Sequence, residues 1–181
     1  MNTFIALFRG INVGGHGRLK MKDLRALLEA LGLKNVKTYL QSGNAVFRTS
    51  SPDSSQLSHD IGMAIGESHQ FTPEVLVLSL EELRSAIVSN PFPEGETQPT
   101  SLHLSFLKSR PSRPDLAKLE SLRSTTERFE LSETVFYLHA PDGIARSKLA
   151  ASVEKALGVV MTGRNWRSVN AVMSMALEIA E

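Results

Sequence analysis

Residues 4–48 read FIALFRGINVGGHGRLKMKDLRALLEALGLKNVKTYLQSGNAVFR, and the order of patterns in this stretch predicts the fold. Residues 4–9 form an apolar run with the length of a buried strand. Apolar side chains then recur at helical spacing over residues 20–31, which predicts an amphipathic helix. Two short strands are expected at residues 36–41 and 45–48, joined by a tight turn. The stretch therefore has the order strand, helix, strand, strand.

The following residues complete this unit. Ser51-Pro52 is expected to open a second helix, because proline is tolerated in a first helical turn. The run EVLVL at residues 74–78 predicts another buried strand. Ser79 and Glu82 have the spacing of a capping box, so we expect a third helix to start there.

Similar patterns return after NPFPEGETQPTS, a segment rich in proline and polar residues. Strands are expected at residues 102–107, 128–131, 134–139 and 159–162. Helices are expected at residues 113–122 and 144–157, and a last helix over the apolar stripe Val169, Val172, Ala176 and Leu177. We therefore predict an α+β protein of two tandem ferredoxin-like subdomains, each with the order β-α-β-β-α-β and a trailing helix. The predicted ranges are 1–90 and 101–181, with a linker at 91–100.

The composition is typical of a soluble globular protein and excludes several classes of protein and of binding site. Hydrophobic residues make up 41% and charged residues 22% of the 181 residues. The absence of cysteine excludes disulfides and cysteine-ligated zinc, and it is compatible with a reducing compartment. No apolar run reaches the ~20 residues of a membrane span, and the start MNTFIALFRG lacks the pattern of a signal peptide. We expect a cytoplasmic protein that does not bind membranes.

The charges are distributed unevenly, although the net charge is only +1. Residues 1–50 hold eight basic and two acidic residues, or +6, whereas residues 51–100 hold one basic and eight acidic residues, or −7. A basic face near the N-terminal loops is one interpretation, and a solvated surface of uneven charge is the other.

The loop from Arg9 to Lys20 is the first candidate site. Connections in compact domains are typically about 4–6 residues long, and this longer loop carries four glycines ahead of a predicted helix. Glycine amides, a helix N-terminus and basic side chains can together hold an anion. The glycine spacing matches neither the Walker loop nor the dinucleotide-binding loop. A flexible connection is the alternative.

The predicted topology places a second segment beside this loop. In a split β-α-β unit, the first loop and the hairpin turn at 41–44 leave the same end of the sheet. We expect them to form one site, although ordinary turn chemistry would also explain the hairpin residues. The candidate ligand-binding residues are Arg9, Asn12, Gly14, Gly15, Arg18, Lys20, Gln41, Ser42 and Asn44.

A second group of candidates lies in the other half of the chain. Arg146 and Lys148 stand in a predicted first helical turn, where cations oppose the helix dipole unless an anion compensates. Arg164 and Asn165 are expected to precede the last helix, where arginine can bind an anion and asparagine can cap. Trp166 is either a stacking surface or, on the apolar face of that helix, a core anchor.

The sequence shows no motif of a catalytic or metal site. The five histidines have neither HxxxH nor HxH spacing, and GxSxG does not occur. We therefore expect no metal and no cofactor, and the residues identify no general base.

Several segments together resemble the bacterial domain of unknown function 1697 family. They are LFRGINVGG, LKMKDLRALLEALGLKNVKTYLQSGNAVF, NPF at 90–92, SK at 147–148, EKALG at 154–158 and TGRNWRSV at 162–169. The resemblance covers almost the whole chain and implies a cytoplasmic α+β protein of two related subdomains, with no established activity. Its motifs fall on residues 9–15, 41–44 and 164–166. Gly163 departs from the family pattern, which more often has a hydroxyl residue there.

The leading hypothesis is a protein that binds an anionic, phosphate-bearing small ligand through its glycine loop and its Arg, Lys and amide side chains. The first alternative is RNA binding, although binding on a sheet needs exposed aromatic side chains that these strands do not suggest. The second is a protein-interaction module with open sheet edges. The third is an enzyme acting on a phosphorylated substrate, with the glycine loop and Arg164 stabilising charge.

Overall fold

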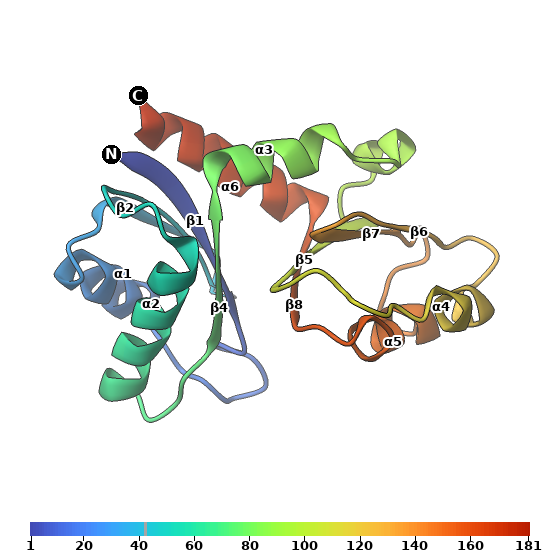
Figure 1. The fold of residues 1–181 in the computed structure, drawn as a ribbon, viewed down its shortest axis with the longest axis horizontal. Coiled ribbons are helices and arrows are strands. Elements are labelled where there is room, and N and C mark those ends of the chain that lie inside the picture. Colours follow the sequence, from blue (N-terminus) through green and yellow to red (C-terminus); the bar gives the residue numbers. More distant parts are fainter. Residues whose placement is uncertain (42) are drawn as a thin grey trace. The chain divides into compact units, whose positions relative to one another are not determined.

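The computed structural model describes residues 1–41 and 43–181, and it has a mixed α+β fold with two four-stranded sheets (Figure 1). Its described chain divides into two compact units, residues 1–85 with 170–181 and residues 86–169. The expected ranges 1–90 and 101–181 differ from this division, because residues 86–100 belong to the second unit and the end of the last helix to the first.

The first unit is built on an antiparallel sheet with the strand order β2-β3-β1-β4. Its elements are β1 (Asn2–Arg9), α1 (Met21–Ala30), β2 (Lys34–Tyr39), β3 (Asn44–Thr49), α2 (Ser54–Ser68) and β4 (Glu74–Ser79). β3 therefore lies between β1 and β2, and β1 lies between β3 and β4. In this arrangement the end of β1, the turn between β2 and β3 and the start of β4 share one end of the sheet.

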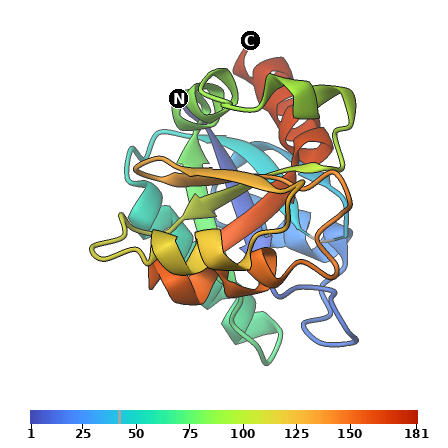
Figure 2. The ribbon, with the colours of Figure 1, turned by 90° about the vertical axis from the view of Figure 1, so that its right-hand side faces the viewer.

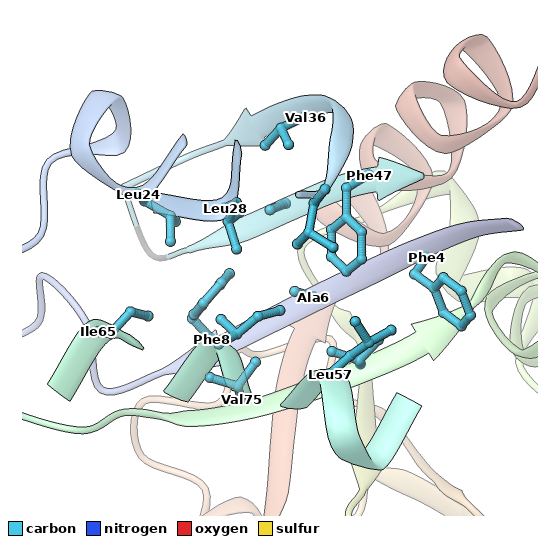
Figure 3. Close-up of a cluster of buried hydrophobic side chains, with 14 of the residues drawn as sticks. Phe4, Ala6, Phe8, Leu24, Leu28, Val36, Phe47, Leu57, Ile65 and Val75 are labelled. Atoms are coloured by element: carbon cyan, nitrogen blue, oxygen red, sulfur yellow. The ribbon is translucent and has the colours of Figure 1, made fainter. Parts of the chain in front are cut away.

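The core of this unit lies between one face of the sheet and the helices α1 and α2 (Figure 3). Alternate residues of β1, namely Phe4, Ala6 and Phe8, point into it, as the two-residue period of a strand requires. Phe47 of β3 stacks on Phe4 with 6.2 Å between the ring centroids. Leu28 lies in the contact face of α1. This packing fixes the end of β1 from which the candidate loop departs.

Two helix ends in this unit show how well local signals predict structure. Gly32 follows the C-cap residue Leu31 of α1 with a φ of 83°, and the amide of Leu33 donates to the carbonyl of Leu28 at 3.3 Å. The expected start of the second helix at Ser51-Pro52 is wrong by two residues. Asp53 caps α2 instead, because its carboxylate accepts two first-turn amides, as the preference of aspartate for this position predicts.

The second unit has an antiparallel sheet with the order β6-β7-β5-β8. Its elements are β5 (Leu102–Leu107), α4 (Leu116–Leu122), β6 (Arg128–Leu131), β7 (Val135–His139), α5 (Lys148–Leu157) and β8 (Met161–Asn165). The helices α4 and α5 lie side by side (Figure 2) and bury Leu119, Leu149 and Val153 against the sheet. Two further helices, α3 (Leu80–Val88) and α6 (Trp166–Ala180), contribute residues to both units.

Several predicted boundaries in this half are shifted. α4 begins at Leu116 after the cap Asp115, and α5 begins at Lys148 after the cap Ser147, because each cap side chain accepts a first-turn amide. β8 covers Met161–Asn165 rather than residues 159–162, since α6 follows the strand without a loop. Leu177 is 40% exposed and Ile179 is buried instead, which keeps the buried stripe of α6 at intervals of three and four residues.

The segment expected to be a linker packs within the second unit. Pro93–Thr97 forms a short 3-10 helix, η1, and Phe92 before it is only 4% exposed. Phe92 stacks with His139, and the guanidinium of Arg128 lies 4.9 Å from the Phe92 ring centroid. Arg128 also pairs with Glu94. Aromatic and charged contacts therefore hold residues that composition alone assigns to a linker.

Candidate functional site

The loop between β1 and α1 folds into a small β-hairpin of its own. Val13 and His16 form an isolated antiparallel bridge, and the amide of His16 donates to the carbonyl of Val13 at 3.0 Å. Between them, Gly14 and Gly15 have φ angles of 58° and 78°. Positive φ at both central residues is the signature of a type I′ turn, which favours glycine. The turn geometry therefore accounts for these two glycines without a ligand.

Asn12 joins this loop to the β2–β3 hairpin. Its side-chain Nδ2 donates to the carbonyls of Leu19 at 2.7 Å and Gln41 at 2.8 Å, and its Oδ1 accepts the amide of Leu19 at 2.9 Å. Its own amide donates to the carbonyl of Gly17 at 2.9 Å. The contact with Gln41 brings together the two segments that the sequence predicted to be neighbours. The Asn12 side chain, predicted as a ligand contact, is largely committed to the chain itself.

Apolar contacts anchor the same loop beneath its exposed tip. Ile11 and Leu19 are 0% and 1% exposed. Gly43 has a φ of 88°, and an added Cβ would collide with the side chain of Ile11 and with Cβ of Phe8. The amide of Phe8 donates to the carbonyl of Gly43 at 3.0 Å. Gly43 is therefore required both by its backbone conformation and by this close packing.

The residues of the hairpin turn that the sequence predicted as ligand contacts differ in their exposure. Asn44 is 0% exposed and its Nδ2 donates to the carbonyl of Tyr39 at 2.8 Å, so its side chain stabilises the turn from inside. Gln41 is exposed, and Ser42 lies outside the described residues. Leu40 is an unexpected feature, because it has a φ of 59° and is 51% exposed. A left-handed conformation costs a leucine roughly 1–2 kcal/mol.

The basic side chains of the site come from the end of the loop. Arg18 and Lys20 are exposed, and Lys20 is the N-cap residue of α1 without a side-chain hydrogen bond to the helix. The amide ends of a helix carry partial positive charge, which these two cations reinforce. Asp23 in the first turn of α1 opposes this charge in part. Arg9 stands opposite Glu74 in the β1–β4 register, so a carboxylate lies near that arginine.

The turn before β4 is the third segment at this end of the sheet (Figure 1). Phe71 packs near Gly17, since an added Cβ there would lie 3.2 Å from the Phe71 ring. His69 packs edge-on against Phe71 with a centroid distance of 6.4 Å, and its Nδ1 is buried without a hydrogen-bond partner in the described chain. Gln70 between them has a φ of 31°. His69 was not predicted, because no motif or spacing distinguishes it.

The second group of candidates lies at the end of β8 and before α5. β7 and β8 both run antiparallel to β5, so both strands finish at the same end of the second sheet. Arg146 and Lys148, in the segment after β7, are exposed. Arg164 is in β8 itself, its Nη1 donates to the carbonyl of Gly163 at 2.8 Å, and burial lowers its pKa to about 10. It therefore remains charged at neutral pH.

Asn165 and Trp166 have structural roles. The Oδ1 atom of Asn165 accepts the amide of Ser168 at 3.0 Å, which confirms that it caps α6. Trp166 is 7% exposed, which favours a core anchor over a stacking surface.

Three further observations on the described residues concern base stacking, metal binding and membrane crossing. Phe4, Phe8 and Phe47 point into the core, so that face of the first sheet presents no aromatic surface for bases. No cluster of His, Asp or Glu in residues 1–41 and 43–181 could hold a metal ion. No helix in the same residues is long and apolar enough to cross a membrane.

The family can be stated from the comparison with known sequences. The model of the family described as Protein of unknown function (DUF1697) matches residues 1–137. The chain belongs to this family. The match includes the glycine loop, the β2–β3 hairpin and NPF, whereas the segments at 147–148, 154–158 and 162–169 lie beyond it. No curated protein matches the sequence.

The fold is similar to that of a solved structure over nearly the full length. It is the conserved bacterial protein SP0830 from Streptococcus pneumoniae, which is 23% identical to this chain with a TM-score of 0.70. The similarity covers 97% of this chain and 98% of that one. At this level of identity the comparison establishes the fold alone.

Proposed function

We propose that the protein binds an anionic, phosphate-bearing small ligand at the end of the first sheet. The observation that carries the proposal is the start of α1, where Lys20 provides no side-chain cap and stands beside Arg18. Asn12 holds the same loop against Gln41, so the basic segment has a fixed position. A preformed group of donors loses less entropy when it binds an anion.

The helix and the two cations have complementary roles. First-turn amides of α1 would donate to phosphate oxygens, and the helix dipole would add roughly 0.3–1 kcal/mol. Charged hydrogen bonds from Arg18 and Lys20 would contribute about 1.5–3 kcal/mol each. These contributions sum to roughly 3.3–7 kcal/mol, which corresponds to a Kd between about 4 mM and about 7 μM. We therefore expect weak to moderate affinity for phosphate alone.

Some of the other expected contacts remain part of this proposal. Gly14 and Gly15 would shape the hairpin beside the ligand, and Arg9 would contribute a more distant charge. Arg146, Lys148 and Arg164 would form a separate anion-binding region in the second unit. We also propose that the two subdomains are ferredoxin-like, which the antiparallel strand orders β2-β3-β1-β4 and β6-β7-β5-β8 support. A cytoplasmic location belongs to the same proposal.

A thermal-shift titration with inorganic phosphate, AMP and ribose 5-phosphate tests the binding. The double variant Arg18→Gln/Lys20→Gln should lose at least about a hundredfold in affinity, because the two charged contacts together are worth at least about 3 kcal/mol. Lys34→Gln is the matched control. Lys34 is an exposed lysine at the start of β2, whereas the candidate site adjoins the other end of that strand. Equal affinity in the double variant and the control would refute the site, and the absence of any stabilisation would refute the function.

A further inference from the structure

We propose that His103 makes part of the second unit sensitive to pH, because its protonation releases residues 98–100 from the start of α6. Residues 98–100 follow η1 and lead through Ser101 to β5, and we call them the η1–β5 connection. The first residues of α6, Trp166–Val169, belong to the same unit. This pH response therefore involves the second unit alone and does not depend on phosphate binding in the first.

The imidazole of His103 lies in the second sheet, on the strand β5 between β7 and β8. Its Nε2 atom is buried and has no hydrogen-bond partner in the part of the chain that the structure describes. The ring bonds the backbone of Thr100, so its Nδ1 atom is the donor to the Thr100 carbonyl. Nδ1 therefore carries the proton of the neutral ring, and Nε2 keeps a buried lone pair. Burial lowers the pKa of His103, against a smaller opposite effect of the Thr100 bond.

The residues that face His103 from the two neighbouring strands are uncharged. Leu138 on β7 and Asn165 on β8 stand directly opposite His103 and share its face of the sheet. Asn165 already uses its Oδ1 atom to accept a backbone amide of α6. His139 and Arg164, the titratable residues next to them, are one position along their strands and therefore point to the other face.

The helices α4 and α5 cover the face of the sheet on which His103 lies, and the side chains that they bury there are apolar. The charged residues of these helices lie outside that apolar cluster; they are Lys118, Glu120, Lys148, Glu154 and Lys155. Protonation of His103 would add a charge to these surroundings and a donor at Nε2 that lacks an acceptor. Such a group favours any arrangement that exposes the ring to water.

The η1–β5 connection is the element that can move to allow this exposure. Gln98 and Thr100 are exposed, so little packing holds their side chains. The amide of Arg167, in the first turn of α6, donates to the carbonyl of Pro99 at 3.3 Å, which is long for such a bond. The next residue, Thr100, is the one that His103 holds. A charged His103 that turns toward water therefore removes the support of Thr100 and breaks the bond between Pro99 and Arg167.

Both flanks of the connection are held by other contacts, which confine the opening. Before η1, Phe92 stacks on His139, and Oε1 of Glu94 lies 3.9 Å from Nδ1 of His139. Protonation of His139 would therefore strengthen this flank. After the connection, the amide of Ala140 donates to the carbonyl of Ser101 at 2.8 Å. Acid therefore opens a short segment and leaves the rest of the unit folded.

Amide hydrogen exchange of the full chain at about pH 7 and about pH 5 tests this response, with rates expressed as protection factors. Because the closed form favours the neutral ring, it is fully stable above about pH 6.5 and loses stability as the pH falls below that value. Protection of the Arg167 amide should therefore fall in acid, by at most about 25-fold if the open form has the ordinary histidine pKa of about 6.5. The amide of Asp115, which donates to the Ala156 carbonyl at 2.8 Å in the same unit, is the internal reference.

Two matched variants identify the histidine that is responsible. His103→Gln should hold the Arg167 protection constant, because glutamine stays uncharged and can still donate to the Thr100 carbonyl. His139→Gln should retain the fall in acid, although His139 is the histidine that contacts Phe92 before η1.

A fall in Arg167 protection that His103→Gln removes and His139→Gln retains supports the proposal. A fall of less than about twofold in the original protein, or one that His103→Gln retains, would overturn it, and so would one that His139→Gln removes. The ring of His103 offers a second measurement that needs no variant. Its NMR titration should give a pKa below the ordinary value, whereas a pKa at or above about 6.5 would overturn the proposal.

Discussion

Replacement of Asn12 tests how the candidate site is held together. Asn12→Gly removes three side-chain hydrogen bonds of 2.7, 2.8 and 2.9 Å and keeps a residue that accepts the φ of 53°. At about 0.5–1.5 kcal/mol each, these bonds sum to roughly 1.5–4.5 kcal/mol, and water can replace part of them because the site is half-exposed. We therefore expect a loss of about 1.5–3 kcal/mol. Asn12→Ala should lose more, since alanine disfavours a positive φ.

Amide hydrogen exchange gives the most direct readout of this change. The amide of Phe8 bonds the carbonyl of Gly43 beneath the loop, so its protection reports whether the loop and the hairpin stay together. A loss of 1.5–3 kcal/mol corresponds to about 10- to 150-fold faster exchange. Asn12→Asp is the second variant. Its carboxylate retains an oxygen that accepts the amide of Leu19 but lacks the Nδ2 group that donates to the carbonyls of Leu19 and Gln41. Protection at Phe8 within about twofold of the original protein in Asn12→Gly would refute the proposed role.

Three further predictions concern stability. Asn165→Ala should destabilise the protein by about 1 kcal/mol in urea unfolding, because α6 loses its cap, and Asn165→Ser should restore most of it. Gly43→Ala should destabilise by more than about 1 kcal/mol, because an added Cβ collides with Ile11 and Phe8 at a φ of 88°; a thermal midpoint equal to that of the original protein would contradict this packing. Tyr137 donates its hydroxyl to the carbonyl of Ala86 at 2.8 Å, and burial, with a smaller effect of Glu130, raises its pKa to about 12. Its neutral form is therefore favoured in the folded state, so the original protein should lose stability as the pH rises from about 10 to about 12, and Tyr137→Phe should lose less over that range.

The sequence predicted most elements because their signals are local. Strands such as residues 102–107 follow from hydrophobic period, and Gly158 ends α5 in the αL conformation that glycine prefers. The predicted helix ends were less accurate where the sequence offers two possible starts, as at Ser51-Pro52 and Asp53. The proximity of the glycine loop and the β2–β3 hairpin followed from strand order alone, and the Asn12–Gln41 contact agrees with it.

The roles of individual side chains were harder to predict. Nothing in the sequence distinguishes an asparagine that contacts a ligand from one, like Asn44, that closes a turn from inside. The glycine content of the loop predicted a flexible backbone. It did not predict the type I′ turn, because that turn depends on the pairing of Val13 with His16. The left-handed backbone of Leu40 and the buried Nδ1 of His69 depend on tertiary structure, and no local pattern indicates them.

The most direct test of the proposed function is a titration of the protein with inorganic phosphate, followed by amide chemical shifts. We predict saturable shifts centred on residues 17–22, with a Kd of about 4 mM or below. The shifts should be lost in Arg18→Gln/Lys20→Gln and retained in Lys34→Gln. Shifts that are confined to Arg146, Arg164 and their neighbours, or that do not saturate by about 40 mM phosphate, would contradict a phosphate site at the start of α1.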